Sequence, residues 1–417
     1  MKYSLFSLAR NALSGHERWP QAWRSPVPRA RYDVVIVGGG GHGLATAYYL
    51  ARVHGLRNVA VLEKGWLGGG NTGRNTTIVR SNYLLDANAR LYELSMKLWE
   101  GLSQELNFNV MYSPRGVLNL AHTPAQRDAF VRRGNAMRLN GVDAEWLERD
   151  AVERRVPLLN CSENARFPVI GGLLQPRGGT VRHDAVAWGY ARAADALGVD
   201  IVQNCEVFDF HREDGRITGV ETNLGRIGAE RVGIAVAGHS GVLAAKAGFP
   251  LPVETHLLQA MVSEPVKPLL DTVVTYGARH LYISQSDKGE LVLGSDLDFY
   301  PSYAQRGNLA VIQDAAAFAL EMFPCLSRLR LMRHWAGMVD MSMDGSPILG
   351  KSPIPGLYLN AGWCYGGFKA TPASGLLFAH TIANDALHPL CEAFNLERFA
   401  EGKLLDENGA GPFPQHH

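Results

Sequence analysis

Hydrophobic and polar positions near the start of the chain follow a strand–turn–helix–strand order. Residues 32–37 form a short, β-branched apolar run, which predicts a buried parallel strand. Residues 44–52 place apolar side chains at helical spacing, and residues 58–62 predict a second strand followed by Glu63. The pattern therefore predicts a parallel sheet with a helical crossover, which is the beginning of an α/β fold.

Two later segments repeat parts of this pattern. An apolar run at 232–237 ends in Gly-His-Ser, and residues 357–360 lead through a glycine-rich stretch into a helix of small residues at 373–379. This second strand–glycine–helix unit lies more than 300 residues after the first. Between them, residues 282–285 and 290–294 predict a β-hairpin with an Asp-Lys-Gly turn.

Composition narrows the classes of protein and partner. The 417 residues include 41 Lys+Arg and 40 Asp+Glu, so the net charge of +1 gives no long-range attraction to nucleic acid or anionic lipid. The five cysteines are odd in number and never spaced as C-x-x-C, which argues against a disulfide framework and a cysteine zinc site. No apolar run approaches the roughly 18 residues of a membrane span. We therefore expect a cytoplasmic protein with no nucleic-acid or membrane partner and no metal.

The turn between the first strand and helix has the composition of a phosphate-binding loop. Gly38, Gly40 and Gly43 satisfy the pattern G-x-G-x-x-G. The first glycine allows the tight turn, the second lets the backbone approach a pyrophosphate, and the third lets the helix pack close to the strand. Glu63 follows twenty residues after Gly43, where a carboxylate accepts hydrogen bonds from both ribose hydroxyls and repels a 2′-phosphate. This arrangement predicts a dinucleotide site and argues against NADP.

A second glycine-rich loop, at residues 64–77, favours FAD over NAD. Asn, Thr and Arg are interleaved with its glycines, so its backbone N–H groups can approach another part of a long ligand. The late helix that follows Thr371 and Pro372 would direct its positive N-terminal end toward the pyrimidine end of a flavin. An NAD enzyme needs neither feature.

The same motifs carry a family resemblance, which extends over residues 31–390. They are GGGGHG at 38–43, Glu63, TTIVR at 76–80, AGHS at 237–240, DGSPILG at 344–350 and GGFKATPASG at 366–375. Together they resemble the FAD-dependent amine and D-amino-acid oxidase family, which includes monomeric sarcosine oxidase, glycine oxidase and dimethylglycine dehydrogenase. Within it, the segments GGGGHGLATAYYL, RNTTIVRSNY, RGVLNLAHT and GVDAEWL are most similar to the β subunits of heterotetrameric sarcosine oxidases.

The resemblance implies an α/β fold with two parts. One is a discontinuous FAD-binding Rossmann-like domain of the glutathione-reductase type, expected at residues 31–115, 171–250 and 335–390. The other is an antiparallel-sheet α+β substrate domain, expected at residues 116–170 and 251–334. We expect an extended N-terminal arm at residues 1–30, rather than a targeting signal, and a C-terminal tail at residues 391–417.

The motifs and the resemblance together assign the cofactor-binding residues. We expect FAD to be bound by Gly38, Gly40, Gly41, His42, Gly43, Glu63, Asn71, Thr72, Arg74, Thr76, Ile78, Val207, Gly238, Gly366, Gly367 and Lys369. In monomeric sarcosine oxidase a cysteine bonds FAD covalently, and the corresponding position here falls at about Gly337. FAD is therefore expected to be non-covalent.

Two basic residues match the family's substrate-binding positions. Family members clamp the carboxylate of an amino acid with cations, and Lys369 and Arg80 occupy the lysine of the G-F-K motif and the arginine that ends TTIVR. Lys369 lies among glycines, aromatics and small residues, where a solvated charge is unexpected. Arg74 is the alternative to Arg80.

A further implication of the resemblance is a second flavin. The β subunits carry FMN bonded to a histidine in a K-H-D segment, which matches Arg182-His183-Asp184 here. We therefore expect covalent FMN at His183. The residues that follow predict a helix over 185–197 with Asp184 as its N-cap.

The resemblance implies the catalytic β subunit of an oxidase that demethylates sarcosine. Electrons would pass from FAD to FMN and then to oxygen, giving glycine, hydrogen peroxide and formaldehyde or a folate-bound one-carbon unit. The expected partners are sarcosine and the α, γ and δ subunits of a hetero-oligomer. Three alternatives remain open: a stand-alone glycine or D-amino-acid oxidase, a dimethylglycine dehydrogenase, and a non-catalytic subunit for electron transfer or assembly.

Overall fold

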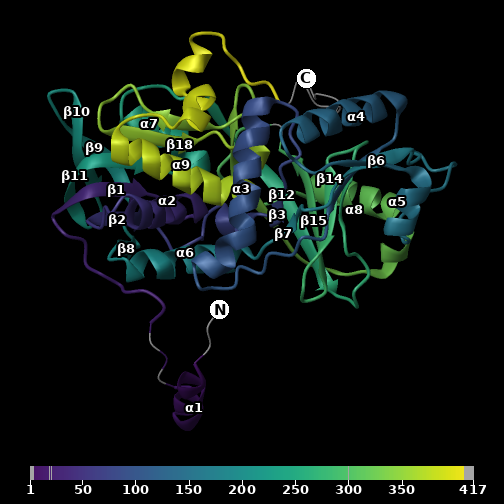
Figure 1. The fold of residues 1–417 in the computed structure, drawn as a ribbon, viewed down its shortest axis with the longest axis horizontal. Helices are drawn as coiled ribbons and strands as arrows, with labels where there is room; N and C mark the ends of the chain where they lie inside the picture. The colour runs from purple at the N-terminus through teal and green to yellow at the C-terminus, as the bar shows by residue number, and fades with distance from the viewer. Residues whose placement is uncertain (1–3, 18, 20, 299, 408–417) are drawn as a thin grey trace.

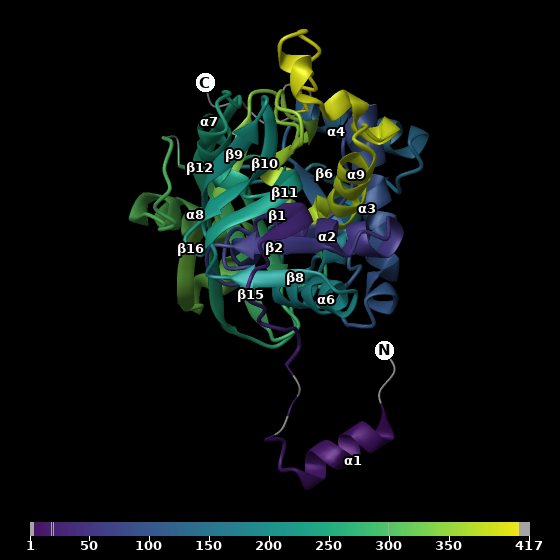
Figure 2. The same ribbon diagram turned by 90° about the vertical axis from the view of Figure 1, so that its left-hand side faces the viewer.

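The structure is a computed structural model that describes residues 4–407 apart from positions 18, 20 and 299. Two large sheets lie side by side in Figure 1, and the long helix α3 (Asp86–Glu105) crosses the view where they meet, packed on α9 to one side of the first sheet (Figure 2). The other helices are α1 (Leu5–Leu13), α2 (Gly41–Val53), α4 (Pro124–Leu139), α5 (Arg149–Arg155), α6 (His183–Ala196), α7 (Ser240–Lys246), α8 (Leu309–Met322) and α9 (Thr371–Asn384). Within these residues, no helix is long and apolar enough to cross a membrane.

The first sheet is built on the predicted parallel strands. Its order is β17-β18-β11-β1-β2-β8, and the β9–β10 hairpin continues from β11. The strands are β1 (Arg31–Val37), β2 (Val59–Glu63), β8 (Asp200–Gln203), β9 (Val207–Glu213), β10 (Arg216–Thr222), β11 (Gly225–Ile234), β17 (Ile348–Lys351) and β18 (Leu357–Ala361). Strand β1 pairs in parallel with both β2 and β11, and β18 pairs in parallel with β11. Distant parts of the chain thus meet in one sheet, as the sequence predicts.

The second sheet is mainly antiparallel and has the order β16-β12-β15-β14-β13-β4-β6-β5. Its strands are β4 (Val117–Ala121), β5 (Glu145–Glu148), β6 (Gly171–Gln175), β12 (Val253–Pro265), β13 (Val273–Tyr276), β14 (Leu281–Gln285), β15 (Glu290–Leu297) and β16 (Leu331–Ser342). The predicted hairpin is the antiparallel pair β14–β15. A short ribbon of β3 (Ile78–Val79) and β7 (Gly179–Thr180) joins neighbouring loops. The expected fold class, a Rossmann-like part and an antiparallel α+β part, is confirmed.

The two sheets divide the chain differently from the sequence expectation in two places. Strand β6 pairs with β4 and β5, and β16 pairs along β12, so both belong to the second sheet. The expected FAD-binding segments 171–250 and 335–390 include these strands or their ends. The motifs identify the loops expected to contact the ligand, but they do not show to which sheet the preceding strand belongs. We propose that the domain boundaries follow the sheets.

Apolar cores cover both faces of the first sheet. Helices α2, α3, α6 and α9 pack a large cluster on one face, which contains Trp99, Tyr190, Leu377 and Phe378. Figure 2 shows these helices on one side of β1 and β2. A second cluster packs α7 against the other face. This burial places the amino ends of α2 and α9 beside each other, at the carboxyl ends of the parallel strands.

The N-terminal arm contains a helix that the sequence analysis did not predict. Helix α1 is capped by the Ser4 hydroxyl, which accepts a hydrogen bond from the Ser7 N–H at 3.2 Å. None of its residues is buried, and it stands apart from the rest of the molecule (Figures 1 and 2). The arm is attached at Arg24, whose Nε lies 2.8 Å from the carboxylate of Asp195 on α6.

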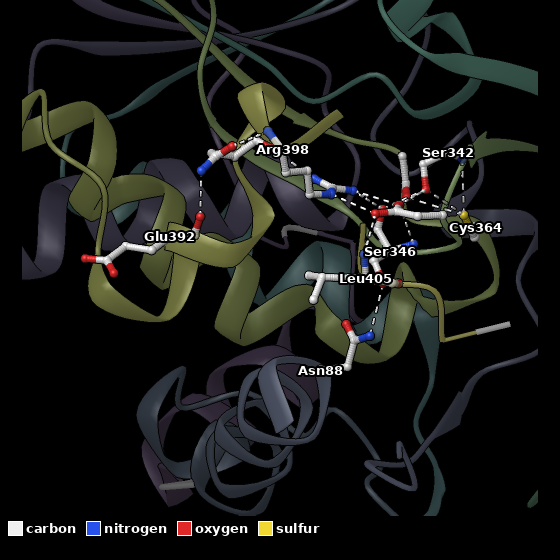
Figure 3. A network of polar contacts seen from close by, with 10 residues as sticks. Asn88, Ser342, Ser346, Cys364, Glu392, Arg398 and Leu405 are labelled. Carbon is white, nitrogen blue, oxygen red and sulfur yellow. Dashed lines mark hydrogen bonds and ion pairs between the residues drawn. The ribbon is translucent and has the colours of Figure 1, made fainter. Parts of the chain in front are cut away.

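The expected C-terminal tail is packed as far as it is described, because a buried ion pair holds it. Arg398 donates from Nε and Nη2 to Asp344 at 2.8 and 2.9 Å (Figure 3). The side chains of Arg398 and Asp344 are only 2% and 0% exposed. The backbone N–H of Leu405 also donates to Asp344 at 3.0 Å, and Ser346 donates to the Leu405 carbonyl at 2.7 Å. The 3-10 turns η6 (Pro389–Phe394) and η7 (Leu396–Phe399) belong to this segment, and residues 408–417 lie outside the described residues.

We predict that Arg398→Met destabilises the protein by about 3–5 kcal/mol, because it leaves the buried Asp344 carboxylate without its cation. Urea unfolding followed by circular dichroism measures this change. The control is Arg226→Met, which removes an exposed ion pair with Glu213 at 3.5 Å and should cost about 1 kcal/mol or less. Equal effects of the two substitutions would contradict the assigned role of Arg398.

Candidate functional site

One continuous cavity of about 1230 Å³ lies between the two sheets. It exceeds the roughly 300–1,000 Å³ of a usual small-ligand pocket, which suits a long ligand together with a substrate. Its walls include the β1–α2 turn, the loop after β2, the loop before α9 and strands of the second sheet. The site is therefore built where the carboxyl ends of the parallel strands face the second sheet.

The glycines of the first motif meet the steric demands that the sequence predicts. Gly38 has φ of +111°, and a Cβ there would overlap the carbonyl oxygen of Ala235. A Cβ on Gly43 would overlap the carbonyl oxygen of Gly38, so only glycine lets α2 start this close to β1. Gly43 itself does not line the cavity, whereas Gly38, Gly40 and Gly41 do.

Glu63 lies at the end of β2, on the wall of the cavity. Its carboxylate accepts hydrogen bonds from the N–H groups of Gly39 and Gly65, both at 2.8 Å. These two bonds hold the carboxylate at the mouth of the glycine turn, which is the position that the sequence predicts for a ribose-binding acid.

The loop after β2 folds back onto the glycine turn through the 3-10 turn η1 (Thr72–Arg74). The Thr72 hydroxyl accepts a hydrogen bond from the Gly41 N–H at 2.9 Å. Arg74 donates to the carbonyls of Gly69 and Gly70, and its own carbonyl accepts a hydrogen bond from Trp335 Nε1 at 2.6 Å. Arg74 thus binds loop carbonyls, a role different from that of Arg80.

Helices α2 and α9 are held together beside the cavity. His42 Nδ1 lies 2.6 Å from the Ser374 hydroxyl, which also accepts a hydrogen bond from Asn360 at 2.8 Å. Burial lowers the pKa of His42 to about 4, so the imidazole is neutral at pH 7. Its ring centroid lies 4.8 Å from that of Trp363. His42 therefore links the two glycine motifs as a neutral side chain.

Lys369 is a buried cation at one end of the cavity. It lies in the 3-10 turn η5 (Phe368–Ala370), and its carbonyl accepts hydrogen bonds from Ser95 at 2.7 Å and Trp99 at 2.8 Å. Its side chain donates only to the Tyr365 carbonyl among the described residues, at 2.9 Å. Burial, and next the charge of Arg80, hold the pKa of Lys369 well below its usual value. An anion bound here would relieve both effects.

Arg80 is the second cation at this end. Its guanidinium donates to Asn82 and lies 5.2 Å from the ring centroid of Tyr83. Both Arg80 and Lys369 line the cavity. The structure therefore brings together the two basic residues that the sequence proposes for a carboxylate.

The remaining residues expected to bind FAD also line the cavity. They are Asn71, Thr76, Ile78, Val207, Gly238, Gly366 and Gly367. Thr76 donates to the Tyr282 hydroxyl at 3.0 Å. Asn71 and Thr371 line this cavity, and their buried Oδ1 and Oγ1 atoms have no hydrogen-bond partner among the described residues. Such orphaned polar atoms and the side-chain-free glycine turn fit a long polar cofactor.

His183 lies outside the cavity, at the start of α6. Its Nε2 is 3.1 Å from the Gly73 carbonyl in η1, while Nδ1 is buried without a hydrogen bond and 3.8 Å from Asp184. Burial lowers the pKa of His183, although Asp184 and the Gly73 carbonyl act in the opposite direction. The helix begins at His183 with Arg182 as its N-cap, so the expected Asp184 cap is wrong. Asp184 instead forms an ion pair with Arg182 at 2.6 Å.

Asp340 and Arg133 are among the ionisable side chains of the cavity wall that sequence reasoning missed. Burial raises the pKa of Asp340 on β16 to about 6, and its carboxylate accepts a hydrogen bond from the Gly362 N–H at 2.6 Å. Arg133 on α4 is 8% exposed and also lines the cavity. Neither lies in a glycine motif, so only the tertiary fold reveals them. No cluster of His, Cys, Asp or Glu suited to a metal occurs within the described residues.

Known proteins place this geometry in a family. Residues 33–381 match the family described as FAD dependent oxidoreductase. The chain belongs to that family. It is therefore a flavin-dependent oxidoreductase, as the motifs predict, and the FAD expectation is confirmed at this level.

Individual proteins agree with the family. The chain is 62% identical to sarcosine oxidase subunit beta of Rhizobium meliloti over 100% of both chains. It is 53% identical to the subunit of the same name from Rhodobacter capsulatus, over 98% of both chains. A crystal structure of L-proline dehydrogenase from P. horikoshii superimposes with a TM-score of 0.84 at 27% identity, covering 91% of this chain and 100% of that one. The predicted likeness to sarcosine oxidase β subunits is confirmed.

We predict that Gly43→Ala abolishes FAD binding, because its methyl group would displace the Gly38 carbonyl and open the β1–α2 turn. Flavin absorbance of the purified protein measures the bound FAD. Gly101→Ala on α3 is the control: nothing lies within 4 Å of a Cβ there, and an alanine in a helix should add up to ~1 kcal/mol of stability. Normal FAD content in Gly43→Ala would show that the turn does not need this glycine.

Proposed function

We propose that the chain is the catalytic β subunit of a sarcosine oxidase and binds FAD in the large cavity. When bound, FAD supplies the two-electron oxidation of the amine, and FMN and then oxygen are the later acceptors. Sarcosine, water and oxygen give glycine, hydrogen peroxide and formaldehyde, or a folate-bound one-carbon unit in place of formaldehyde. We also propose a cytoplasmic location, which the five free cysteines support.

The observation that carries the proposal is the buried Lys369 beside Arg80. A cation that donates to only one carbonyl among the described residues lacks its full set of acceptors. The carboxylate of an amino acid supplies both the acceptors and the opposite charge. Binding it there fixes one end of the substrate, and the cationic surroundings favour the neutral form of its amine, which is the form that can be oxidised.

FAD would be held without a covalent bond. Glu63 would accept hydrogen bonds from the ribose, and the turn at Gly38, Gly40 and Gly43 would accommodate the pyrophosphate. Gly337 lines the cavity where monomeric sarcosine oxidase has its cysteine. Burial raises the pKa of the nearby Cys364 thiol to about 12, so the thiol stays protonated and unreactive.

His183 would carry the FMN. Its lowered pKa keeps the imidazole neutral, which is the nucleophilic form, and its buried Nδ1 has no hydrogen-bond partner within the described chain. The side chain lies outside the FAD cavity, so a group attached here would be partly exposed unless another protein covers it.

Partner subunits would cover this second site. Two apolar side chains near His183 in the chain or in space are exposed. Trp188, on the same helix α6, is 44% exposed. Met111 is 42% exposed, and the residue before it, Val110, accepts a hydrogen bond from the Arg182 N–H through its carbonyl. Exposed apolar side chains of this size around a cofactor position favour an interface. The names of the relatives, which include the word subunit, support a hetero-oligomer.

We predict that Lys369→Met raises the Kd of acetate, a probe of the carboxylate site, by about 10- to 100-fold, because a charge-assisted contact is lost. Titration of the holoenzyme, followed by the flavin spectrum, measures Kd. Lys369→Arg should restore only part of the affinity, since the planar guanidinium of arginine differs in shape and donor geometry from the compact ammonium of lysine. The control is Lys351→Met, which removes an exposed lysine paired with Asp385 at 3.0 Å. An unchanged Kd in Lys369→Met would remove this residue from the site.

We predict that His183→Ala eliminates protein-bound flavin after acid precipitation, while FAD appears in the supernatant as it does for the unaltered protein. Mass spectrometry of the yellow peptide, with the chain co-expressed with its partner subunits, identifies the attachment residue. His211→Ala, a histidine paired with Glu221 on the β9–β10 hairpin, is the control and should keep the covalent flavin. A flavin peptide containing another residue would exclude His183. A monomeric chain that is fully active with both flavins would exclude the partner subunits.

A further inference from the structure

Arg133 is a buried cation that nothing in the described structure neutralises directly. It lies on α4, is 8% exposed and lines the same cavity as Lys369 and Arg80. Its Nε is buried without a hydrogen-bond partner, and its guanidinium forms no ion pair with a described carboxylate. Its guanidinium carbon lies 5.9 Å from the centroid of the Phe130 ring.

Leaving this guanidinium unpartnered costs free energy. Burial lowers the pKa of Arg133 to about 10, which still leaves the side chain charged at neutral pH. A buried charge is retained when an opposite charge and hydrogen-bond acceptors compensate its lost hydration. A guanidinium that faces a cavity and lacks such acceptors fits an anionic ligand that supplies them.

Glu407, the carboxylate that most favours the charge on Arg133, is already engaged. It accepts hydrogen bonds from the N–H groups of Leu84 and Leu85 at 2.7 and 3.0 Å and from Asn88 at 3.2 Å. Its oxygens therefore hold the start of α3. Glu407 offsets part of the charge from a distance and leaves the donors of Arg133 for another acceptor.

Lys369, Arg80 and Arg133 all line the same cavity. The charge of Arg80 contributes to lowering the pKa of both Lys369 and Arg133. Arg80 and Arg133 both act on Tyr83, which stacks on Tyr92 with centroids 4.0 Å apart. Arg133 comes from α4 and Lys369 from the turn η5, so different elements bring the two side chains to the cavity wall.

We propose that Arg133 forms a second anion subsite, which binds the distal carboxylate of a ligand whose first carboxylate is held by Lys369 and Arg80. The ligand class is small dicarboxylates, including secondary amines with two carboxylate arms; sarcosine fills only the first subsite. The inference rests on the proposed function for the placement of the first carboxylate.

Titration of the holoenzyme with acetate, succinate and glutarate tests this inference, with the flavin spectrum as the readout. We expect the better-fitting diacid to bind at least about tenfold more tightly than acetate, because it gains a charge-assisted contact. Arg133→Met should remove this preference and leave the acetate Kd within about twofold. Arg133→Lys should retain part of the preference, since lysine keeps the positive charge but lacks the bidentate guanidinium donors.

Arg127→Met provides the matched control. Arg127 lies on the same helix, is exposed and pairs with Asp128 at 3.1 Å, so its removal should leave all three Kd values unchanged. If Arg133→Met does not retain FAD, Arg133→Gln, which is neutral and polar, replaces it and should show the same loss of preference.

Two results would overturn the inference: no diacid preference in the unaltered holoenzyme, or an undiminished preference in the neutral Arg133 variant. The proposed function fails by a separate result, an unchanged acetate Kd in Lys369→Met. The ratio of diacid to acetate affinity therefore reports on Arg133, and the acetate affinity alone reports on Lys369.

Discussion

The close packing of α2 on α9 is the constraint on which the site depends. A Cβ on Gly375 would overlap Ala45, so small residues on both helices let the two backbones approach each other. His42 and Ser374 add a hydrogen bond of 2.6 Å across this contact. As a result, two glycine motifs that lie more than 300 residues apart in the chain direct their helix starts into one cavity. The positive ends of both helices then favour anionic groups of a ligand.

Buried charges follow two different rules in this molecule. Arg398 and Asp344 neutralise each other, backbone groups complete their hydrogen bonds, and the pair holds the C-terminal segment against the loop that follows β16. Lys369 and Arg133 are also buried, but they have few or no acceptors within the described protein. A ligand that supplies the missing acceptors would offset the cost of burying these cations, so the contrast with Arg398 supports the proposed binding roles of Lys369 and Arg133.

The features of the site that depend on local chemistry could be predicted from the sequence. The turn at Gly38 and Gly43 and the placement of Glu63 follow from steric and hydrogen-bonding needs that a short motif expresses directly. Arg133 could not be found this way, because a helix with ordinary composition carries it and only the packing of α4 against the cavity buries it. The packing of the C-terminal segment was not predicted either, because Arg398 is buried only through its ion pair with Asp344, which is distant in the sequence.

The 3-10 turn η1 separates the two proposed flavin positions. On one side Thr72 accepts a hydrogen bond from the Gly41 N–H at the phosphate end of the cavity, and on the other the Gly73 carbonyl lies 3.1 Å from His183. A Cβ on Gly73 would clash with the Gly68 carbonyl at 2.6 Å, so this turn can be so tight only with glycine. A group attached at His183 would therefore lie one backbone turn from the cavity proposed for FAD, which suits the proposed electron transfer between the two flavins.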